Sequence, residues 1–173
     1  MITTVLAHVP AWVWVLLAAL IALGVSQTFP RSIALRRATI MPIALIVLSI
    51  SGVTGTFHGE PLALAGWAVG LAGAVAVALS AGAWKGIGWS AQTQRLLVPG
   101  SWWPLAIIMG IFMTKFAVGT TLAIHPSSAA DPTFATLVSL AYGAFSGVFF
   151  SRGLAMWKVA HRALNAQMSA NAA

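Results

Sequence analysis

The chain contains no cysteine. This absence excludes disulfide bonds, thiolate metal sites, iron–sulfur clusters and thiol catalysis. Acidic residues are almost as scarce, since Glu60 and Asp131 are the only two. The sequence also shows no paired carboxylates, no Ser/His/Asp arrangement and no glycine-rich phosphate loop. We therefore expect neither an enzyme nor a protein with a bound cofactor.

Charged residues of either sign make up only 6% of the 173 residues, whereas hydrophobic residues make up 60%. The mean hydropathy is +0.93. Because a globular protein of this size could not bury so much apolar surface, we predict an integral membrane protein whose main partner is the lipid bilayer. The net charge of +7 would point to nucleic acid in a soluble protein. Here the basic residues mostly flank the apolar runs, so no nucleic-acid partner is expected.

The apolar runs predict an all-α, polytopic fold with five transmembrane helices, since about 20 residues are needed to cross the hydrocarbon core. The expected spans cover residues 10–28, 38–56, 61–84, 103–124 and 132–150. The last helix is expected to continue past the membrane to about residue 165. Residues 1–166 would form a single domain, and residues 167–173 a flexible tail.

The basic residues predict the orientation of these spans. Eight of the nine Lys and Arg residues fall in segments that the five spans place on one side, and both acids fall on the other. Basic loops are cytoplasmic, so the N-terminus is expected outside and the C-terminus in the cytoplasm. The loop 85–101 is expected at the cytoplasmic interface, with a short surface helix around residues 90–98. The residues predicted to be cytoplasmic are Arg31, Arg36, Arg37, Lys85, Arg95, Arg152, Lys158 and Arg162.

The opening of the chain carries a resemblance. It reads His-Val-Pro-Ala-Trp-Val-Trp-Val-Leu-Leu over residues 8–17, and a loop with Arg31, Arg36 and Arg37 follows. This combination of PxWVWxLL and an arginine-rich first loop resembles a family of small, uncharacterised bacterial inner-membrane proteins, most closely over residues 7–45. The resemblance implies a multi-pass protein of the bacterial inner membrane. It implies no activity and no catalytic residues.

Lys115 lies near the middle of the fourth span. A lysine at the bilayer centre costs about 2.5–3.5 kcal/mol on insertion scales, so it persists where it is paired, hydrated or deprotonated. We predict that its amine faces the bundle interior and forms a site for an anion or for protons, with Gly119 leaving room one turn on. Alternatively, oxygen atoms of neighbouring side chains or carbonyls simply hold the amine. The neighbours considered are Ser49, Ser51, Thr54, Ser139 and Tyr142.

Two ridges of small residues predict close helix packing. In the third span Gly66 and Gly70 lie one turn apart, which favours a position near the centre of the bundle. The fifth span carries a small residue at every fourth position over three turns. The partner helix is either another span of the same chain or a span of a second copy in a homo-oligomer. The residues of the second ridge are Ser139, Gly143, Gly147 and Ser151.

The predicted outer rim gathers histidines and both acids, a combination that can bind divalent metals. The alternative is structural, because Asp131 precedes Pro132 and Glu60 precedes Pro61, as carboxylates at helix N-termini do. The spacing matches no zinc motif, which favours the structural interpretation. The candidate metal ligands are His8, His58, Glu60, His125 and Asp131.

Two classes of function remain open. The first is a small transporter or channel that uses Lys115 to handle an anion or protons. The second is a structural or accessory membrane protein that associates with partner helices through small-residue faces. A polar cavity that reaches Lys115 would favour the first, and a closed core with an exposed small-residue ridge would favour the second.

Overall fold

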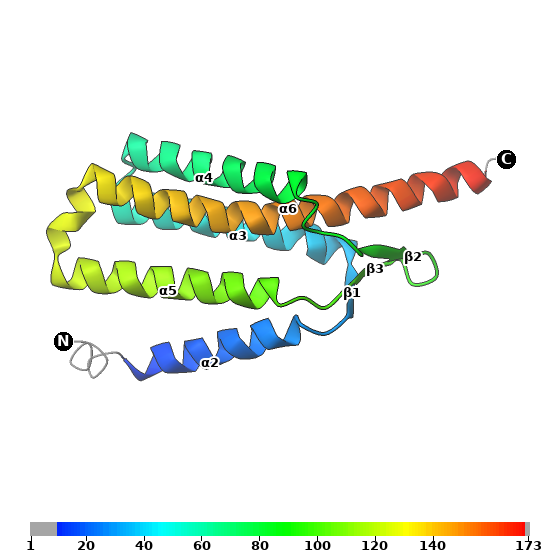
Figure 1. Ribbon diagram of the computed structural model, residues 1–173, viewed down its shortest axis with the longest axis horizontal. Coiled ribbons are helices and arrows are strands. Elements are labelled where there is room, and N and C mark those ends of the chain that lie inside the picture. Colours follow the sequence, from blue (N-terminus) through cyan, green and yellow to red (C-terminus); the bar gives the residue numbers. More distant parts are fainter. Residues whose placement is uncertain (1–9, 172–173) are drawn as a thin grey trace.

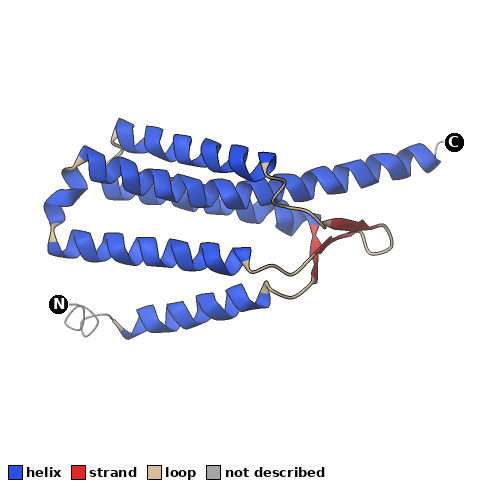
Figure 2. Ribbon diagram, in the orientation of Figure 1, coloured by secondary structure: helices blue, strands red, loops and turns tan. Residues whose placement is uncertain are grey.

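Within residues 10–171, which the computed structural model describes, five α-helices run back and forth along one long axis (Figure 1). They are α2 (Ala11–Ser26), α3 (Leu35–Phe57), α4 (Pro61–Ser80), α5 (Trp103–Ile124) and α6 (Pro132–Asn171). The connections contain strands β1 (Arg31–Ala34), β2 (Gly88–Ser90) and β3 (Arg95–Val98), and the 3-10 helix η1 (Pro126–Ala130). Helices dominate the fold, so the all-α class is confirmed, with one small sheet in addition (Figure 2).

The apolar helices are those of a membrane-embedded protein. Helices α3, α4, α5 and α6 are each long and apolar enough to cross a membrane, whereas α2 has only 16 residues. Large aliphatic side chains on the outward faces are exposed, as Leu48, Val69 and Val77 illustrate. Such exposure would be unfavourable in water, and lipid removes the penalty.

Helix α6 is the centre of the bundle. It packs along α4 for most of the length of α4, along α3 on another side, and more lightly against α5. Helix α2 lies at the far edge and packs mainly on α5 (Figure 1). The third span, α4, was expected near the centre and instead lies at the opposite edge. The expectation was wrong because the small residues of α4 serve contact with a single neighbour, α6.

The contact between α4 and α6 depends on glycine. A Cβ atom at Gly70 of α4 would collide with the backbone of Leu140, and one at Gly143 of α6 would collide with the backbone of Trp67. Gly66 and Gly147 face the partner helix in the same way, against Thr136 and Leu71. Two backbones can approach this closely only where side chains are missing, as in small-residue packing of membrane helices.

The loop segments that were expected in the cytoplasm form a sheet, where a short surface helix was expected at residues 90–98. The strands are antiparallel in the order β1-β3-β2, and Leu97 pairs with both Ser32 and Gly88. In β3 the side chains alternate, with Leu96 and Val98 buried and Leu97 exposed. A period of two residues is that of a strand, which explains why the expected helix does not form. The buried face packs on Met156 of α6.

Several helix ends differ from the expected spans. Helix α3 begins at Leu35, so that Arg36 and Arg37 belong to its first turn. Helix α4 ends at Ser80, and Gly82 then turns the chain with a φ of 60°. Helix α5 has the same bounds as the fourth expected span. Helix α6 continues to Asn171 and includes residues that were expected to be flexible, because Gln167, Met168 and Ala170 are strong helix formers.

Candidate functional site

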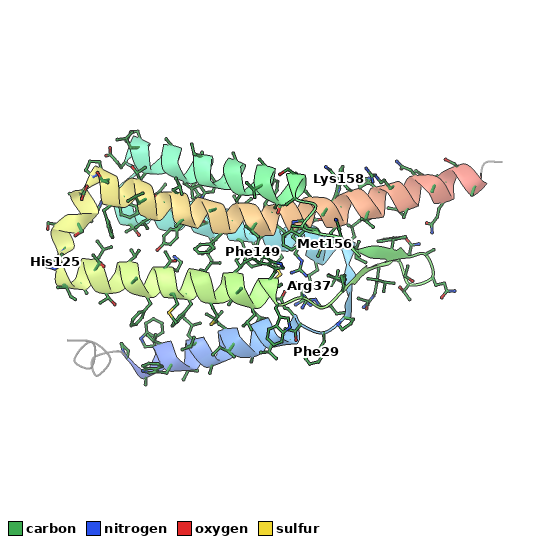
Figure 3. All side chains as sticks on the ribbon, viewed as in Figure 1. Phe29, Arg37, His125, Phe149, Met156 and Lys158 are labelled. Carbon is green, nitrogen blue, oxygen red and sulfur yellow. The ribbon has the colours of Figure 1, made fainter. Side chains whose placement is uncertain are left out.

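A groove runs between α3 and α5 with α6 as its floor. It consists of a larger cavity of about 740 Å³ near the sheet and a smaller one of about 80 Å³ toward the middle of the helices. The two cavities share Leu45 of α3, Ile111 of α5 and Phe149 of α6 as lining residues. The two cavities therefore adjoin each other, and we call them together the α3–α5 groove. Phe149 and Met156 of α6 both line the larger cavity and are labelled in Figure 3.

The groove is open at its side because α3 and α5 pack little on each other. Met41 and Leu48 of α3 line it, and 48% of the surface of Met41 and 68% of that of Leu48 are exposed. Its walls are mainly aliphatic. A molecule with an apolar portion can therefore lie in the groove and still contact the surrounding lipid.

Four arginine residues line the larger cavity at the end near the sheet. They come from four different elements: Arg31 from β1, Arg37 from α3, Arg95 from β3 and Arg152 from α6. The two acidic residues of the chain, Glu60 and Asp131, precede α4 and α6 at the opposite end of the bundle. The cavity wall thus carries several positive charges and no carboxylate.

Arg152 is the most buried of these arginines, with 7% of its surface exposed. Its guanidinium carbon lies 5.6 Å from the ring centroid of Trp84, within range of a cation–π contact. The indole nitrogen of Trp84 donates a hydrogen bond to the hydroxyl of Ser151 at 2.9 Å, which fixes the ring. A charge so far from water requires compensation, and within the wall of the cavity no acidic side chain provides it.

Arg31 is held at the same end by Gln27. One guanidinium nitrogen of Arg31 donates to the side-chain oxygen of Gln27 at 2.7 Å, and Gln27 is itself buried. Burial, and then the charge of Arg37, lowers the pKa of the Arg31 guanidinium. Both effects disfavour the charged form. A bound anion would reverse the second effect, because it would place a negative charge between two positive ones.

Lys115 lies in the smaller cavity, halfway along α5. Its ammonium nitrogen is 4.6 Å from the ring centroid of Tyr142 on α6. A Cβ atom at Gly52 of α3 would lie 3.7 Å from the same nitrogen. The amine therefore points from α5 across the α3–α5 groove toward α3 and α6, and Lys115 is exposed.

Of the five residues considered as holders of the amine, Ser49, Ser51 and Thr54 use their hydroxyl groups elsewhere. Ser49 donates to the carbonyl of Tyr142 at 3.4 Å and accepts from the indole of Trp67 at 3.0 Å. Ser51 and Thr54 donate to carbonyls of their own helix. Ser139 is fully buried and, within residues 10–171, its hydroxyl has no partner. Tyr142 contacts the Lys115 amine with the face of its aromatic ring.

Gly119 is exposed, and a Cβ atom there would meet nothing within 4 Å. It lines neither part of the groove. The glycine next to the amine is instead Gly52, a residue that sequence reasoning missed. The arginine end was also missed as a site, since its four residues are far apart in the chain. The only available signal was an arginine, Arg152, at the end of a long apolar run.

The small-residue ridges are occupied within the chain. Gly66 and Gly70 face α6, and Gly143 and Gly147 face α4. Ser139 and Ser151 are completely buried. These ridges consequently present no free face to a second copy.

The rim residues behave as helix-end residues. One carboxylate oxygen of Asp131 accepts hydrogen bonds from the backbone nitrogens of Thr133 at 2.8 Å and Phe134 at 3.5 Å, as an N-cap does. His58 follows α3 in the left-handed conformation, Glu60 precedes α4, and His125 ends α5. In the described part of the chain, no three His, Cys, Asp or Glu residues gather to hold a metal ion. His8 lies outside the described residues.

Comparison with known proteins shows that the chain belongs to the Family of unknown function (DUF6622), whose family model matches residues 1–167. This confirms the resemblance to an uncharacterised family. No curated protein and no solved structure matches the chain.

Proposed function

We propose that this member of the DUF6622 family is a multi-pass protein of the bacterial inner membrane with five spans, its N-terminus outside and its C-terminus in the cytoplasm. The alternating directions of α2 to α6 support this topology (Figure 1). Helix α2 would reach about 24 Å at 1.5 Å per residue, and it packs on α5, which is long enough to span. The sheet end carries the arginines and would face the cytoplasm.

We further propose that the protein is a small transporter or channel for an anion or for protons, with Lys115 as its intramembrane site. The observation that carries this proposal is that the two cavities of the α3–α5 groove adjoin each other. One is lined by four arginines at the sheet end, and the other contains Lys115 near the middle of α5. Fixed positive charge at both places would attract an anion into the groove and lower the energy of its passage.

The alternative, a structural or accessory membrane protein, has less support. It depends on small-residue faces that could bind partner helices, and the glycines of α4 and α6 are used against each other. We also propose that the protein is not an enzyme.

The test is anion and proton flux in liposomes that contain the purified protein. The charge-removing variant is Lys115→Met, which keeps the apolar stem of the side chain. The matched control is Lys158→Met, since Lys158 is exposed on α6 and does not line the groove. Probes are chloride, nitrate, acetate and phosphate, with a pH-sensitive dye for protons. We expect flux of at least one probe to be lost in Lys115→Met and retained in Lys158→Met. Equal flux in both variants would overturn the proposal.

A further inference from the structure

We infer that the arginine end of the α3–α5 groove binds an anionic phospholipid, with the phosphate between the guanidinium groups and the acyl chains along the aliphatic part of the groove. This inference rests on the proposed membrane orientation but does not depend on transport. It concerns the cavity near the sheet and makes no use of Lys115.

Charge is the first argument. Arg31, Arg37, Arg95 and Arg152 converge on one cavity from four elements, and no carboxylate lies in its wall. Arg152 is more than nine-tenths buried and lines this cavity. Guanidinium groups form paired hydrogen bonds with phosphate oxygens, so a phosphate would supply the compensation that the buried charge lacks.

Shape is the second argument. The cavity, about 740 Å³, lies in the range of sites for whole organic ligands and is far larger than an inorganic anion needs. Away from the arginines its wall is mainly aliphatic, with side chains from four helices. They include Leu20 and Leu23 of α2, Met41 and Leu45 of α3, Ile108 and Ile111 of α5, and Phe149 and Met156 of α6. A ligand that fits this wall is charged at one end and apolar along the rest.

Position is the third argument. Phe29, Trp102 and Trp103 are exposed at the same end of the bundle, where α2 ends and α5 begins. Aromatic residues of this kind mark the headgroup level of a membrane. The arginine end therefore lies at the depth of lipid phosphates. Since the groove is open between α3 and α5, a lipid can enter from the bilayer without passing through water. Basic cavities between helices on the cytoplasmic side bind anionic headgroups.

The experiment uses the full chain in detergent micelles and measures binding by the increase in thermal stability and by native mass spectrometry. The probes are phosphatidylglycerol, phosphatidylcholine and inorganic phosphate at equal concentrations. We expect phosphatidylglycerol to raise the Tm and to remain bound, while phosphatidylcholine and inorganic phosphate do neither. Equal stabilisation by inorganic phosphate alone would overturn the lipid assignment in favour of a free anion, and equal stabilisation by phosphatidylcholine would overturn the role of charge.

Variants locate the site. Arg37 and Arg36 are adjacent, exposed residues in the first turn of α3, but only Arg37 lines the cavity. We expect Arg37→Gln to weaken phosphatidylglycerol binding about fivefold, which is roughly the contribution of one basic residue near an anionic lipid, and Arg36→Gln to leave it unchanged. Equal effects of the two would overturn the inference. Arg152→Gln should weaken binding more, and the Arg37/Arg36 pair remains decisive should Arg152→Gln fail to fold.

Lys115→Met separates this inference from the proposed function. It should keep phosphatidylglycerol binding, because Lys115 does not line the larger cavity. Loss of flux with retained lipid binding supports both proposals, and retained flux with retained lipid binding overturns only the transport proposal. Loss of lipid binding in a folded Lys115→Met protein would contradict the placement of the lipid.

Discussion

The ammonium of Lys115 on α5 lies over the ring of Tyr142 on α6, with 4.6 Å between the nitrogen and the ring centroid. Helices α5 and α6 otherwise touch only lightly. This contact therefore spans the groove and joins the half of the bundle formed by α2 and α5 to the half formed by α3, α4 and α6. An attraction between an ammonium and an aromatic face is worth about 0.5–2 kcal/mol, depending on how dry the site is.

We predict that Lys115 and Tyr142 are energetically coupled. A double-mutant cycle of Lys115→Met and Tyr142→Leu should give a coupling energy of about 1 kcal/mol in the free energy of unfolding in detergent. Tyr142→Phe retains the ring and serves as the control, so a cycle with this variant should give almost no coupling. Additive effects in the Tyr142→Leu cycle would show that the ring does not hold the amine.

Sequence reasoning found Lys115 because one charge in an apolar run is visible without a fold. It did not find the arginine end, because residues 31, 37, 95 and 152 meet only after the chain has folded. The helices were predictable from their apolar length. The sheet was not predictable, because its strands have only three or four residues each. An alternation of buried and exposed residues as short as that of β3 fits a helix as well as a strand. The sequence also did not indicate which helix lies at the centre of the bundle, since α4 and α6 both carry ridges of small residues.

The packing of α4 on α6 predicts opposite effects for two nearby glycines. At Gly70 an added methyl group would collide with the backbone of Leu140, whereas at Gly73 it would meet nothing within 4 Å. Gly70→Ala should lower the free energy of unfolding in detergent by about 1–3 kcal/mol through overpacking. Gly73→Ala should raise it by up to about 1 kcal/mol, because alanine favours a helix. Similar shifts in the two variants would mean that the helices do not approach at Gly70.

The sheet predicts a similar contrast between adjacent leucines. Leu96 is fully buried, and Leu97 is 49% exposed. Leu96→Ala should destabilise the protein by about 2–5 kcal/mol, the usual range for a buried leucine. Leu97→Ala should lower the free energy of unfolding much less, because the Leu97 side chain is partly exposed and has fewer contacts to lose. Thermal unfolding in detergent measures both. If residues 90–98 formed a surface helix, the two effects would not follow this alternation.

The proposed orientation predicts which positions can be labelled from outside the cell. The chain contains no cysteine, so each introduced cysteine is a unique site for a membrane-impermeant maleimide. Position 128 lies in η1 and position 92 in the turn between β2 and β3, at opposite ends of the bundle. Gln92 is exposed and Ser128 is half-buried, and cysteine is close in size to serine, so both substitutions should leave the fold intact.

Ser128→Cys should react in intact cells, and Gln92→Cys only after permeabilisation. The basic residues Arg31, Arg36, Arg37 and Arg95 all belong to the end with position 92, and such residues remain on the cytoplasmic side. Glu60→Cys supplies a second outer position, because Glu60 precedes α4 at the same end as η1. The reverse labelling pattern would place the arginine end of the groove outside the cell. An anionic lipid of the cytoplasmic leaflet could then not reach it, so this single measurement also bears on the proposed lipid site.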